Sequence, residues 1–427
     1  MVVMVVGCQQ RGGESYQISS YYSSHNYYSV LFAVDIDKKS KKAMAPLPPG
    51  PKGLPVIGYL PFLGTFLHKK FTELAGKYGS IYKLWLGNKL CIVISSPSLA
   101  KEVFRDKDAI FANRDPPTAS RIASYGGNDI AWSSYGPEWK KMRKVFVREM
   151  LSNPVDFGEL VFEIIANAIN SMLCGGTVKG EKWISFVSEF RKLAEELMVL
   201  QGKPNVSDLF PVLARFDLQG HCGGWHRHNI NHARMDDGRA NATSRIMEKV
   251  YQELDEVVGH SNIVEEFHLP NLQLLNAVMK ETLRLHPALP LSVPHISSQS
   301  CTLGGYTIPK GSTVFLNVNA IHKDPVLWDN ALEFRPERFL NKDSGSFDYS
   351  GNNFQYLPFG SGRRICPGVP LAERMFMFIF ASLLHSFEWK LLNGTEVELS
   401  DKFGIVVKKK NPLLLIAKPR LSNFDLY

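Results

Sequence analysis

The chain has 427 residues, of which 44% are hydrophobic and 21% are charged, and its formal net charge is +8. This length and composition suit one large α-rich domain or two fused ones, and the positive charge favours an acidic partner or a membrane surface. The six cysteines show no C-x-x-C spacing, so neither a zinc cage nor a disulfide framework is implied, and a reducing compartment fits. Basic clusters lack interleaved aromatic residues, so no nucleic-acid partner is expected.

Residues 1–44 form a Ser/Tyr/Gln-rich leader that we expect to be disordered. Its apolar runs, residues 1–6 and 30–34, are far shorter than the ~20 residues of a membrane-spanning helix, and the stretch between them is not a signal peptide. A stiff polyproline-like spacer, Ala-Pro-Leu-Pro-Pro-Gly-Pro, follows at residues 45–51. The chain as given therefore predicts no membrane anchor.

The next segments predict a hairpin and two helices. Residues 81–86 and 90–94 alternate in polarity around Gly87-Asn88, which predicts a β-hairpin. Residues 98–105 are expected to form a short helix capped by Ser98. Residues 138–150 have apolar positions at helical spacing, which predicts an amphipathic helix with a basic polar side. That polar side carries Lys140, Lys141, Lys144 and Arg148.

The C-terminal half predicts further helices and a small sheet. Residues 270–285 are expected to form a helix that ends before Pro287, with Glu281 and Arg284 on one face. Residues 303–311 and 313–318 are consistent with a small β-sheet. An apolar helix follows over residues 371–387. The fold class expected is mainly α with a small β-rich subdomain.

The most informative stretch, Pro-Phe-Gly-Ser-Gly-Arg-Arg-Ile-Cys-Pro-Gly at residues 358–368, leads into that apolar helix. It presents a single cysteine, Cys366, between two arginines and a helix start, and both neighbours favour the thiolate form that ligates iron. Three glycines allow positive φ and a close approach to a flat ligand. A buried structural cysteine beside a Gly-rich turn is the alternative, but it leaves these offsets unexplained.

This string is similar to the haem-binding signature Phe-x-x-Gly-x-Arg-x-Cys-x-Gly of the cytochrome P-450 family. The resemblance implies that Cys366 is the proximal ligand of a haem b iron and that Arg364 pairs with a haem propionate. It also implies a cofactor-binding role for the other matching positions of the loop. These positions are Phe359, Gly360, Gly362 and Gly368.

Further family motifs occur in the expected order. Trp139 and Arg143 match a Trp-x-x-x-Arg pair that contacts a haem propionate, and His295 matches another propionate contact. The resemblance also implies a buried ionic triad that shapes the backbone around the cysteine loop. Its members are Glu281, Arg284 and Arg338. The resemblance covers about residues 45–220 and 244–420 and implies the cytochrome P-450 fold.

The resemblance fails in the centre of the chain. The family's central helix carries Ala/Gly-Gly-x-Asp/Glu-Thr-Thr, whose acid and threonine supply protons during oxygen activation, and this motif is not found. Residues 221–232 instead contain four histidines and a cysteine, which a metal site could explain, although their spacing fits no established pattern. A one-base frame shift over residues 221–240 permits Gly-Gly-Thr-Asp-Thr-Thr, and it forces glycine at Trp225-His226, where the motif demands it.

We therefore expect an out-of-frame segment at about residues 221–243 and internal gaps near residues 153 and 220, which disrupt the central helix and its neighbours. The expected organisation is a leader over 1–44 in place of the family's membrane anchor, a P-450 domain over 45–420 and a tail over 421–427. The resemblance to plant microsomal members implies the endoplasmic reticulum membrane, and because this chain shows no anchor, a peripheral or cytoplasmic location is the alternative.

The function implied is that of a haem-thiolate monooxygenase. Such an enzyme inserts one oxygen atom from O₂ into a small apolar substrate, here a plant terpenoid or phenolic, with electrons from NADPH through a cytochrome reductase. Two alternatives remain open: a haem-binding protein without turnover, and a polypeptide that does not fold, as from a faulty gene model or a pseudogene.

Overall fold

The protein is described by a computed structural model over residues 45–64, 66–124, 126–127, 129–147, 208, 237–340, 347–391, 401–402, 406–409 and 415–421. The predicted leader, the expected gaps near residues 153 and 220, residues 221–236 and nearly all of the predicted tail lie outside these residues. Residues 237–243 belong to the start of a long helix, α9.

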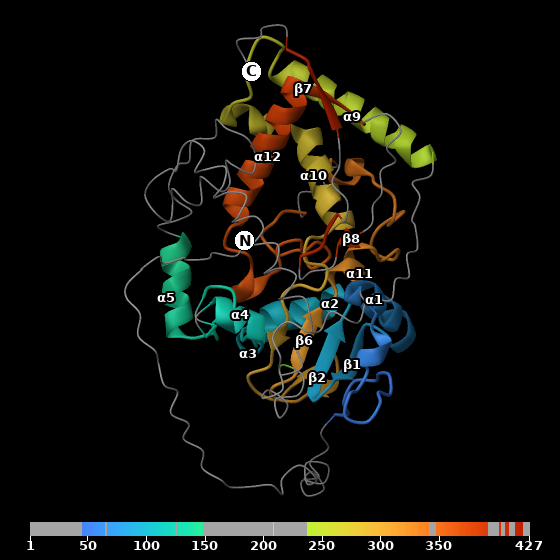
Figure 1. Ribbon diagram of the computed structural model, residues 1–427, viewed down its shortest axis with the longest axis vertical. Coiled ribbons are helices and arrows are strands. Elements are labelled where there is room, and N and C mark those ends of the chain that lie inside the picture. Colours follow the sequence, from blue (N-terminus) through green and yellow to red (C-terminus); the bar gives the residue numbers. More distant parts are fainter. Residues whose placement is uncertain are drawn as a thin grey trace, which may run out of the picture.

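The described residues form a helical part and a β-rich part, which lie at opposite ends of the molecule in Figure 1. The helical part is built on three long helices that contact one another, and the β-rich part on a four-stranded sheet. The expected fold class, mainly α with a small β-rich subdomain, is thus confirmed. The three long helices are α9 (Asp237–Val257), α10 (Gln273–Leu285) and α12 (Val369–Ser386).

The helical part is held by an apolar core between the three long helices. Val250 and Leu254 of α9, Leu275 of α10 and Met377 of α12 are buried in one cluster. Helix α12 is apolar on nearly every side: Met377 and Ala381 face this core, whereas Phe376 and Phe380 are exposed among the described residues. Shorter elements of this part are η5 (Glu266–Asn271), η6 (Pro336–Phe339), β7 (Phe387–Leu391) and β10 (Leu415–Pro419), the last two pairing antiparallel.

The sheet of the β-rich part has the strand order β1-β2-β6-β3. Strands β1 (Ile81–Leu86) and β2 (Lys89–Ile94) form the predicted hairpin, with Gly87 at φ +58° in its two-residue turn. Strand β6 (Thr313–Leu316) pairs parallel with β2, and the short β3 (His295–Ile296) pairs antiparallel with β6.

Residues 303–311 and 313–318, predicted to contribute to a small β-sheet, do form strands, but the strands belong to two different sheets. Strands β4 (Cys301–Leu303) and β5 (Tyr306–Ile308) form a separate hairpin, while β6 belongs to the main sheet. The two strands of the remaining small pair are β8 (Asp401–Lys402) and β9 (Lys408–Lys409). Parallel pairing needs a remote partner, which a local sequence pattern does not indicate.

Two further boundaries differ from prediction. The helix expected over residues 98–105 starts one residue earlier, as α2 (Pro97–Lys101), and continues as the π-helix η2 (Glu102–Asp106). Its cap is Ser96, whose hydroxyl accepts a hydrogen bond from Leu99 N at 3.4 Å, and not Ser98. Pro97 explains the shift, because a proline fits the first turn of a helix. Similarly, α10 starts at Gln273, since Pro270 lies in η5.

The remaining helices cover the sheet or flank the cysteine loop. They are η1 (Leu60–Phe62), α1 (Leu67–Tyr78), α3 (Asp108–Phe111), α4 (Thr118–Ala123), α5 (Pro137–Val145), α11 (Val318–His322) and η8 (Gly362–Arg364). Helix α5 matches the predicted amphipathic helix with an end at Val145. Among the described residues, none of the helices has the length and apolar character required to span a bilayer.

Candidate functional site

The Cys366 loop runs between the helical part and the β-rich part. It enters from a turn at Leu357, forms η8 and ends at Gly368, where α12 begins. Gly362 has φ +65°, and a Cβ there would lie 2.3 Å from the carbonyl oxygen of Phe104. Only glycine allows this close approach to η2, and the neighbouring Arg363 N–H donates to Asp108 of α3 at 3.0 Å, which ties the loop to this side.

Cys366 itself is half-buried and lines a hollow of about 390 Å³. Its main-chain N–H donates to the carbonyl of Phe359 at 3.0 Å, which closes the loop on itself. The ring of Phe359 packs edge-on against Tyr349, with the centroids 5.3 Å apart. Arg143 also lines the hollow. Cys366 therefore lines an accessible hollow, and the main chain around it is fixed by its own hydrogen bond to Phe359.

Two of the predicted arginines, Arg143 and Arg364, lie over the indole ring of a third predicted residue, Trp139. The guanidinium of Arg364 lies 4.2 Å from the ring centre of Trp139, and that of Arg143 lies 5.5 Å from it. Arg364 Nε donates to the carbonyl of Ala112 at 2.6 Å, and Arg143 Nη2 donates to that of Ile365 at 2.8 Å. Helix α5 thus attaches to the cysteine loop through these side chains.

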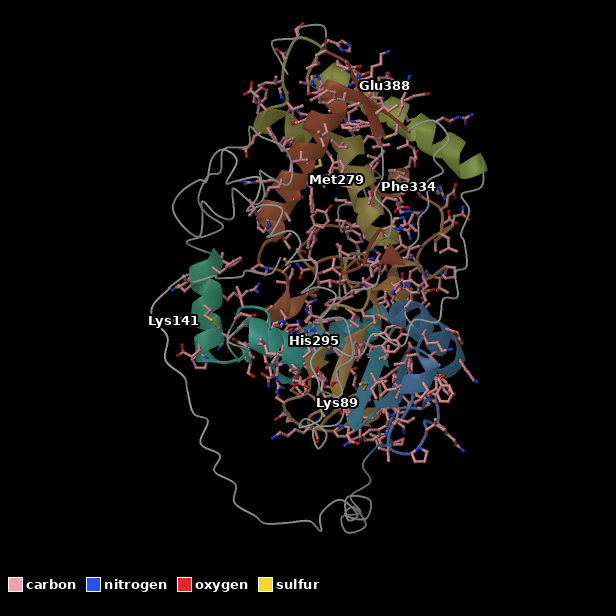
Figure 2. The ribbon with its side chains drawn as sticks, in the orientation of Figure 1. Lys89, Lys141, Met279, His295, Phe334 and Glu388 are labelled. Atoms are coloured by element: carbon pink, nitrogen blue, oxygen red, sulfur yellow. The ribbon has the colours of Figure 1, made fainter. Side chains whose placement is uncertain are left out.

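His295 lies deep beside this group, near the middle of the molecule in Figure 2. Its Nδ1 is 2.6 Å from the carbonyl oxygen of Phe111, and its ring packs edge-on against Phe104. Burial lowers the pKa of His295 well below its usual value, and the charges of Arg114 and Arg364 lower it further. We conclude that the ring is neutral and next to two cations.

Arg114 was missed from the sequence and is the most buried cation of the group. It is 8% exposed, and its Nη1 donates to the carbonyls of Val293 and Pro294, the latter at 2.7 Å. Burial, followed by the charge of Arg364, lowers the pKa of Arg114 to about 9. Burial, followed by the charge of Arg143, likewise lowers the pKa of Arg364 to about 10.

These guanidinium groups fit an anionic ligand. Within the described residues, the hydrogen bonds of Arg114, Arg143 and Arg364 go to main-chain carbonyls and not to carboxylates. Arg114 Nε and Arg364 Nη1 are buried without any partner. A buried donor without an acceptor costs about 1–3 kcal/mol, so two of them on arginines whose charges act on one another indicate a ligand with carboxylate oxygens. Haem, with its two propionates, has this chemistry.

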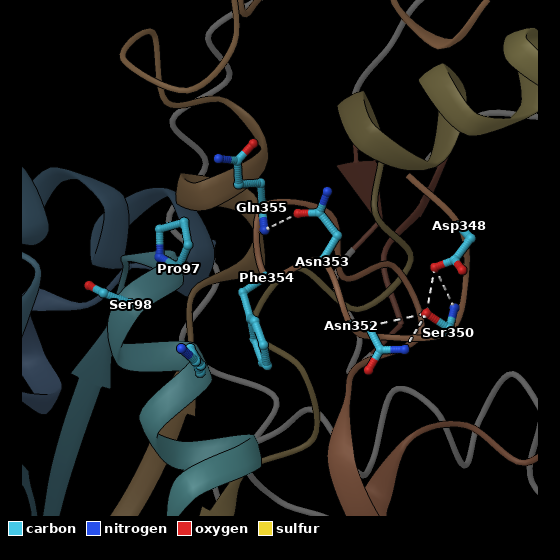
Figure 3. Close-up of a pocket in the computed structure, with 9 residues that line it drawn as sticks. Pro97, Ser98, Asp348, Ser350, Asn352, Asn353, Phe354 and Gln355 are labelled. Atoms are coloured by element: carbon cyan, nitrogen blue, oxygen red, sulfur yellow. Dashed lines mark hydrogen bonds between the residues drawn. The ribbon is translucent and has the colours of Figure 1, made fainter. Parts of the chain in front are cut away.

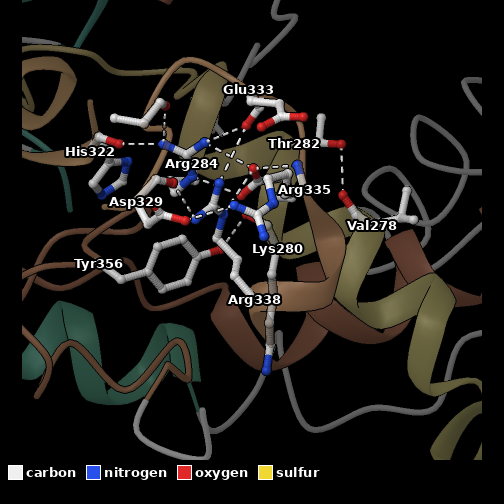
Figure 4. Close-up of polar contacts among 12 residues, drawn as sticks. Val278, Lys280, Thr282, Arg284, His322, Asp329, Glu333, Arg335, Arg338 and Tyr356 are labelled. Atoms are coloured by element: carbon white, nitrogen blue, oxygen red, sulfur yellow. Dashed lines mark hydrogen bonds and ion pairs between the residues drawn. The ribbon is translucent and has the colours of Figure 1, made fainter. Parts of the chain in front are cut away.

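The triad residues belong to a polar network, in which Figure 4 labels Arg284 and Arg338. Glu281 and Arg284 are fully buried and form a two-point ion pair, with Nε–Oε2 at 2.7 Å and Nη2–Oε1 at 2.8 Å. Arg338 Nε reaches Glu281 Oε1 at 3.1 Å. Arg284 also donates to the carbonyls of His322 and Ala331 at 2.6 and 2.7 Å. The three residues therefore meet, and they fix several loops at once.

A larger hollow of about 540 Å³ lies nearby, between α2 and residues 348–355 (Figure 3). It is lined by polar groups such as Asn352, Asn353 and Gln355 and has no thiol in its lining. The hydrogen bonds drawn in Figure 3, including Ser350 Oγ to Asp348 at 2.5 Å, join residues of this loop to one another. We therefore place the chemistry in the smaller hollow at Cys366.

The alternative metal site at residues 221–232 lies outside the described residues, as do residues 221–236 of the expected out-of-frame segment, whereas residues 237–243 are helical in α9. Among the residues that the structure does describe, no group of three or more His, Cys, Asp or Glu side chains is placed to hold a metal ion.

Known proteins similar to this chain share one family. The profile of the family described as Cytochrome P450 matches residues 48–175 and 243–416. A flavonoid 3',5'-hydroxylase of Solanum melongena is 31% identical over 477 residues, which cover 89% of this chain and 92% of the relative. A probable (S)-N-methylcoclaurine 3'-hydroxylase of Coptis japonica is 32% identical, covering 94% of this chain and 98% of the relative.

A further plant relative and a solved structure belong to the same family. A geraniol 8-hydroxylase of Catharanthus roseus is 32% identical and covers 86% of this chain and 93% of the relative. A solved structure of a zebra fish cytochrome P450 with abiraterone has a TM-score of 0.62 at 22% identity, covering 84% of this chain and 100% of that one. The expected fold is therefore confirmed.

Proposed function

This chain belongs to the cytochrome P450 family, and we propose that it binds haem through Cys366 as a monooxygenase of plant secondary metabolism. The relatives described above are named hydroxylases and monooxygenases, and the cofactor of the family is haem. The observation that carries the proposal is the pair of buried, unpartnered donors on Arg114 and Arg364 beside the cysteine loop. When bound, the haem iron would supply the activation of O₂.

The chain's own residues would hold and orient that group. Cys366 would supply the thiolate ligand from a loop whose backbone is fixed at Phe359. Arg114 and Arg364 would donate to the propionates, with Arg143 and Trp139 closing the same side and His295 next to them. Phe359, Gly360, Gly362 and Gly368 would shape the loop, and Glu281, Arg284 and Arg338 would support it.

For the substrate, we propose a small apolar phenolic or terpenoid. This proposal is supported by the names of the relatives, which act on flavonoids, on an alkaloid precursor and on geraniol. The test is a panel of such compounds added to the haem-loaded protein. A substrate-induced shift of the haem absorption with a phenolic or terpenoid, and none with a charged sugar or nucleotide, is expected.

For the electron donor, we propose an NADPH-dependent cytochrome reductase that docks on α5. Lys140, Lys141 and Lys144 are exposed on this helix, and Arg143 of the same helix bonds to the residue before Cys366 (Figure 2 labels Lys141). A basic face so close to the thiol fits an acidic partner. Lys141→Glu should slow reduction of the haem by the reductase most strongly at low salt, whereas Lys249→Glu on α9 should not.

For localisation, we propose attachment to the endoplasmic reticulum membrane. Exposed apolar side chains gather near the start of the described chain, namely Leu54, Val56, Ile57, Phe62 and Trp85. Apolar and aromatic groups of this kind are stable at a lipid surface. Flotation with lipid vesicles tests this: binding by the wild type should be lost in Val56→Asp with Phe62→Asp.

A haem-binding protein without turnover is the second candidate. It is favoured by the family match, which leaves residues 176–242 unmatched, and by the absence of the acid–threonine motif from the sequence. The reduced, CO-bound difference spectrum and NADPH-dependent turnover separate the candidates. A thiolate-type band with turnover supports the enzyme, the band without turnover supports the second candidate, and no haem uptake contradicts both. Cys366→Ala should abolish the band.

A further inference from the structure

His322 links two features that the proposed function treats separately, the ion triad and the Cys366 loop. It is the last residue of α11 and is fully buried. Its carbonyl oxygen accepts a hydrogen bond from Arg284 Nη1 at 2.6 Å, and its ring Nε2 accepts one from the main-chain N–H of Leu357 at 2.9 Å. One residue thus bonds to the triad with its backbone and to the start of the loop with its side chain.

The imidazole is held firmly and is neutral. Its ring stacks on Tyr356 with centroids 5.5 Å apart, and the Tyr356 hydroxyl donates to the carbonyl of Lys280 at 3.0 Å. Burial, followed by the charge of Arg284, lowers the pKa of His322 to about 3. Since Nε2 accepts, the proton of the neutral ring is on Nδ1, a buried atom that makes no hydrogen bond of good geometry, and the nearby main chain of Arg284 and Leu283 opposes the lowering of the pKa.

The one hydrogen bond of good geometry that the ring makes is therefore the bond that Nε2 accepts from Leu357 N. Histidine supplies an acceptor at Nε2 for the N–H of Leu357, which an apolar side chain of similar size cannot do. Without it, the N–H of Leu357, itself a buried residue, would be unpaired instead. The arrangement therefore favours a role for the ring in holding the main chain at Leu357.

The hydrogen bonds continue from Leu357 into the loop. The carbonyl of Leu357 accepts from Gly360 N at 3.2 Å, and the carbonyl of Phe359 accepts from Cys366 N at 3.0 Å. Gly360 turns the chain with φ +75°. A short series of bonds thus leads from Arg284 through His322 to the main chain of Cys366.

We propose that His322 is a positioning residue that fixes the Cys366 loop relative to the ion triad, by accepting the N–H of Leu357. The consequence for haem ligation depends on the proposed function, whereas the link itself is a property of the chain. The two are therefore tested separately, first in the full chain without added haem and then in the haem-loaded protein.

The first test is amide hydrogen exchange of residues 357–366 in the haem-free chain. His322→Phe keeps a ring but removes the acceptor, and we expect exchange at Leu357 to rise about tenfold or more. His322→Gln restores an acceptor and should stay close to the wild type. The matched control is His385→Phe: His385 is 1% exposed, bonds to the carbonyl of Gly259 and also has an unpaired Nδ1, but lies at the far end of α12.

The second test is the reduced, CO-bound spectrum of the haem-loaded variants. His322→Phe should convert part of the thiolate-type band into the thiol type, with recovery in His322→Gln and no change in His385→Phe. If His322→Phe does not fold, His322→Asn, whose side chain is too short to reach Leu357, replaces it.

Unchanged exchange in His322→Phe, or an equal rise in His385→Phe, would overturn the positioning role. A normal thiolate-type band in His322→Phe despite faster exchange would overturn its consequence for the cysteine. If exchange responds as expected but even the wild type takes up no haem, the positioning role holds and the proposed function fails.

Discussion

Glu281 is the residue whose change should affect stability most. Its carboxylate is fully buried and accepts two hydrogen bonds from Arg284, one from Arg338 and one from the main-chain N of Arg335 at 2.8 Å. Glu281→Gln keeps the volume but removes the negative charge, so Arg284 becomes a buried cation without a neutralising partner. Removing one member of a buried ion pair costs about 3–5 kcal/mol.

This loss should be measurable by urea denaturation, because it is a large part of the roughly 5–15 kcal/mol by which domains are usually stable. The control is Glu337→Gln, a solvent-exposed carboxylate 3.9 Å from Lys249, which should change the free energy of unfolding by no more than about 0.5 kcal/mol. A loss below about 1 kcal/mol in Glu281→Gln, or equal losses in both variants, would refute the reasoning.

Three further predictions concern the loop and its surroundings. Gly362→Ala should cost clearly more stability than Gly311→Ala, because both have positive φ but only the first places a Cβ against the Phe104 carbonyl; equal losses in urea denaturation would contradict this. Burial lowers the pKa of His322 to about 3 in the folded protein, whereas in the unfolded chain the ring takes up a proton below about pH 6.5. Acid therefore favours the unfolded chain, and between pH 6 and 4 the free energy of unfolding should fall by about 1.4 kcal/mol per pH unit for His322 alone. His322→Gln should show a shallower fall, and an unchanged slope would contradict the buried neutral ring. Arg364→Leu should weaken haem binding about tenfold or more in a haem titration, since a charge-assisted bond is lost, and unaltered affinity would argue against the propionate contact.

Local patterns in the sequence predicted the parts of the fold that depend on local interactions. The hairpin over residues 81–94 follows from alternation around Gly87-Asn88, and α12 follows from a long apolar run. The Ser98 cap was wrong because Pro97 permits an earlier start, with Ser96 as the cap. The parallel pairing of β2 with β6 was missed, since its partners lie far apart along the chain.

In the candidate site, too, short motifs were predictable from the sequence, whereas contacts between remote residues were not. Cys366, its glycines and the Trp139–Arg143 spacing are visible as short motifs, and the structure brings the arginines and the indole together. Arg114 and His322 carry no such spacing signal. Their importance comes from burial against the carbonyls of Val293 and Pro294 and against the N–H of Leu357, contacts that only the folded chain creates.

The parallel pairing of β2 with β6 also has a consequence for synthesis on the ribosome. Residues 91–94 emerge early, but their partners, residues 313–316, emerge only after most of the chain has been made. At translation rates of about 5–20 residues per second, the apolar edge of β2 waits on the order of tens of seconds. During that interval an unpaired edge strand can pair with other chains, so the yield of folded protein should depend on chaperones that cover the nascent N-terminal hairpin.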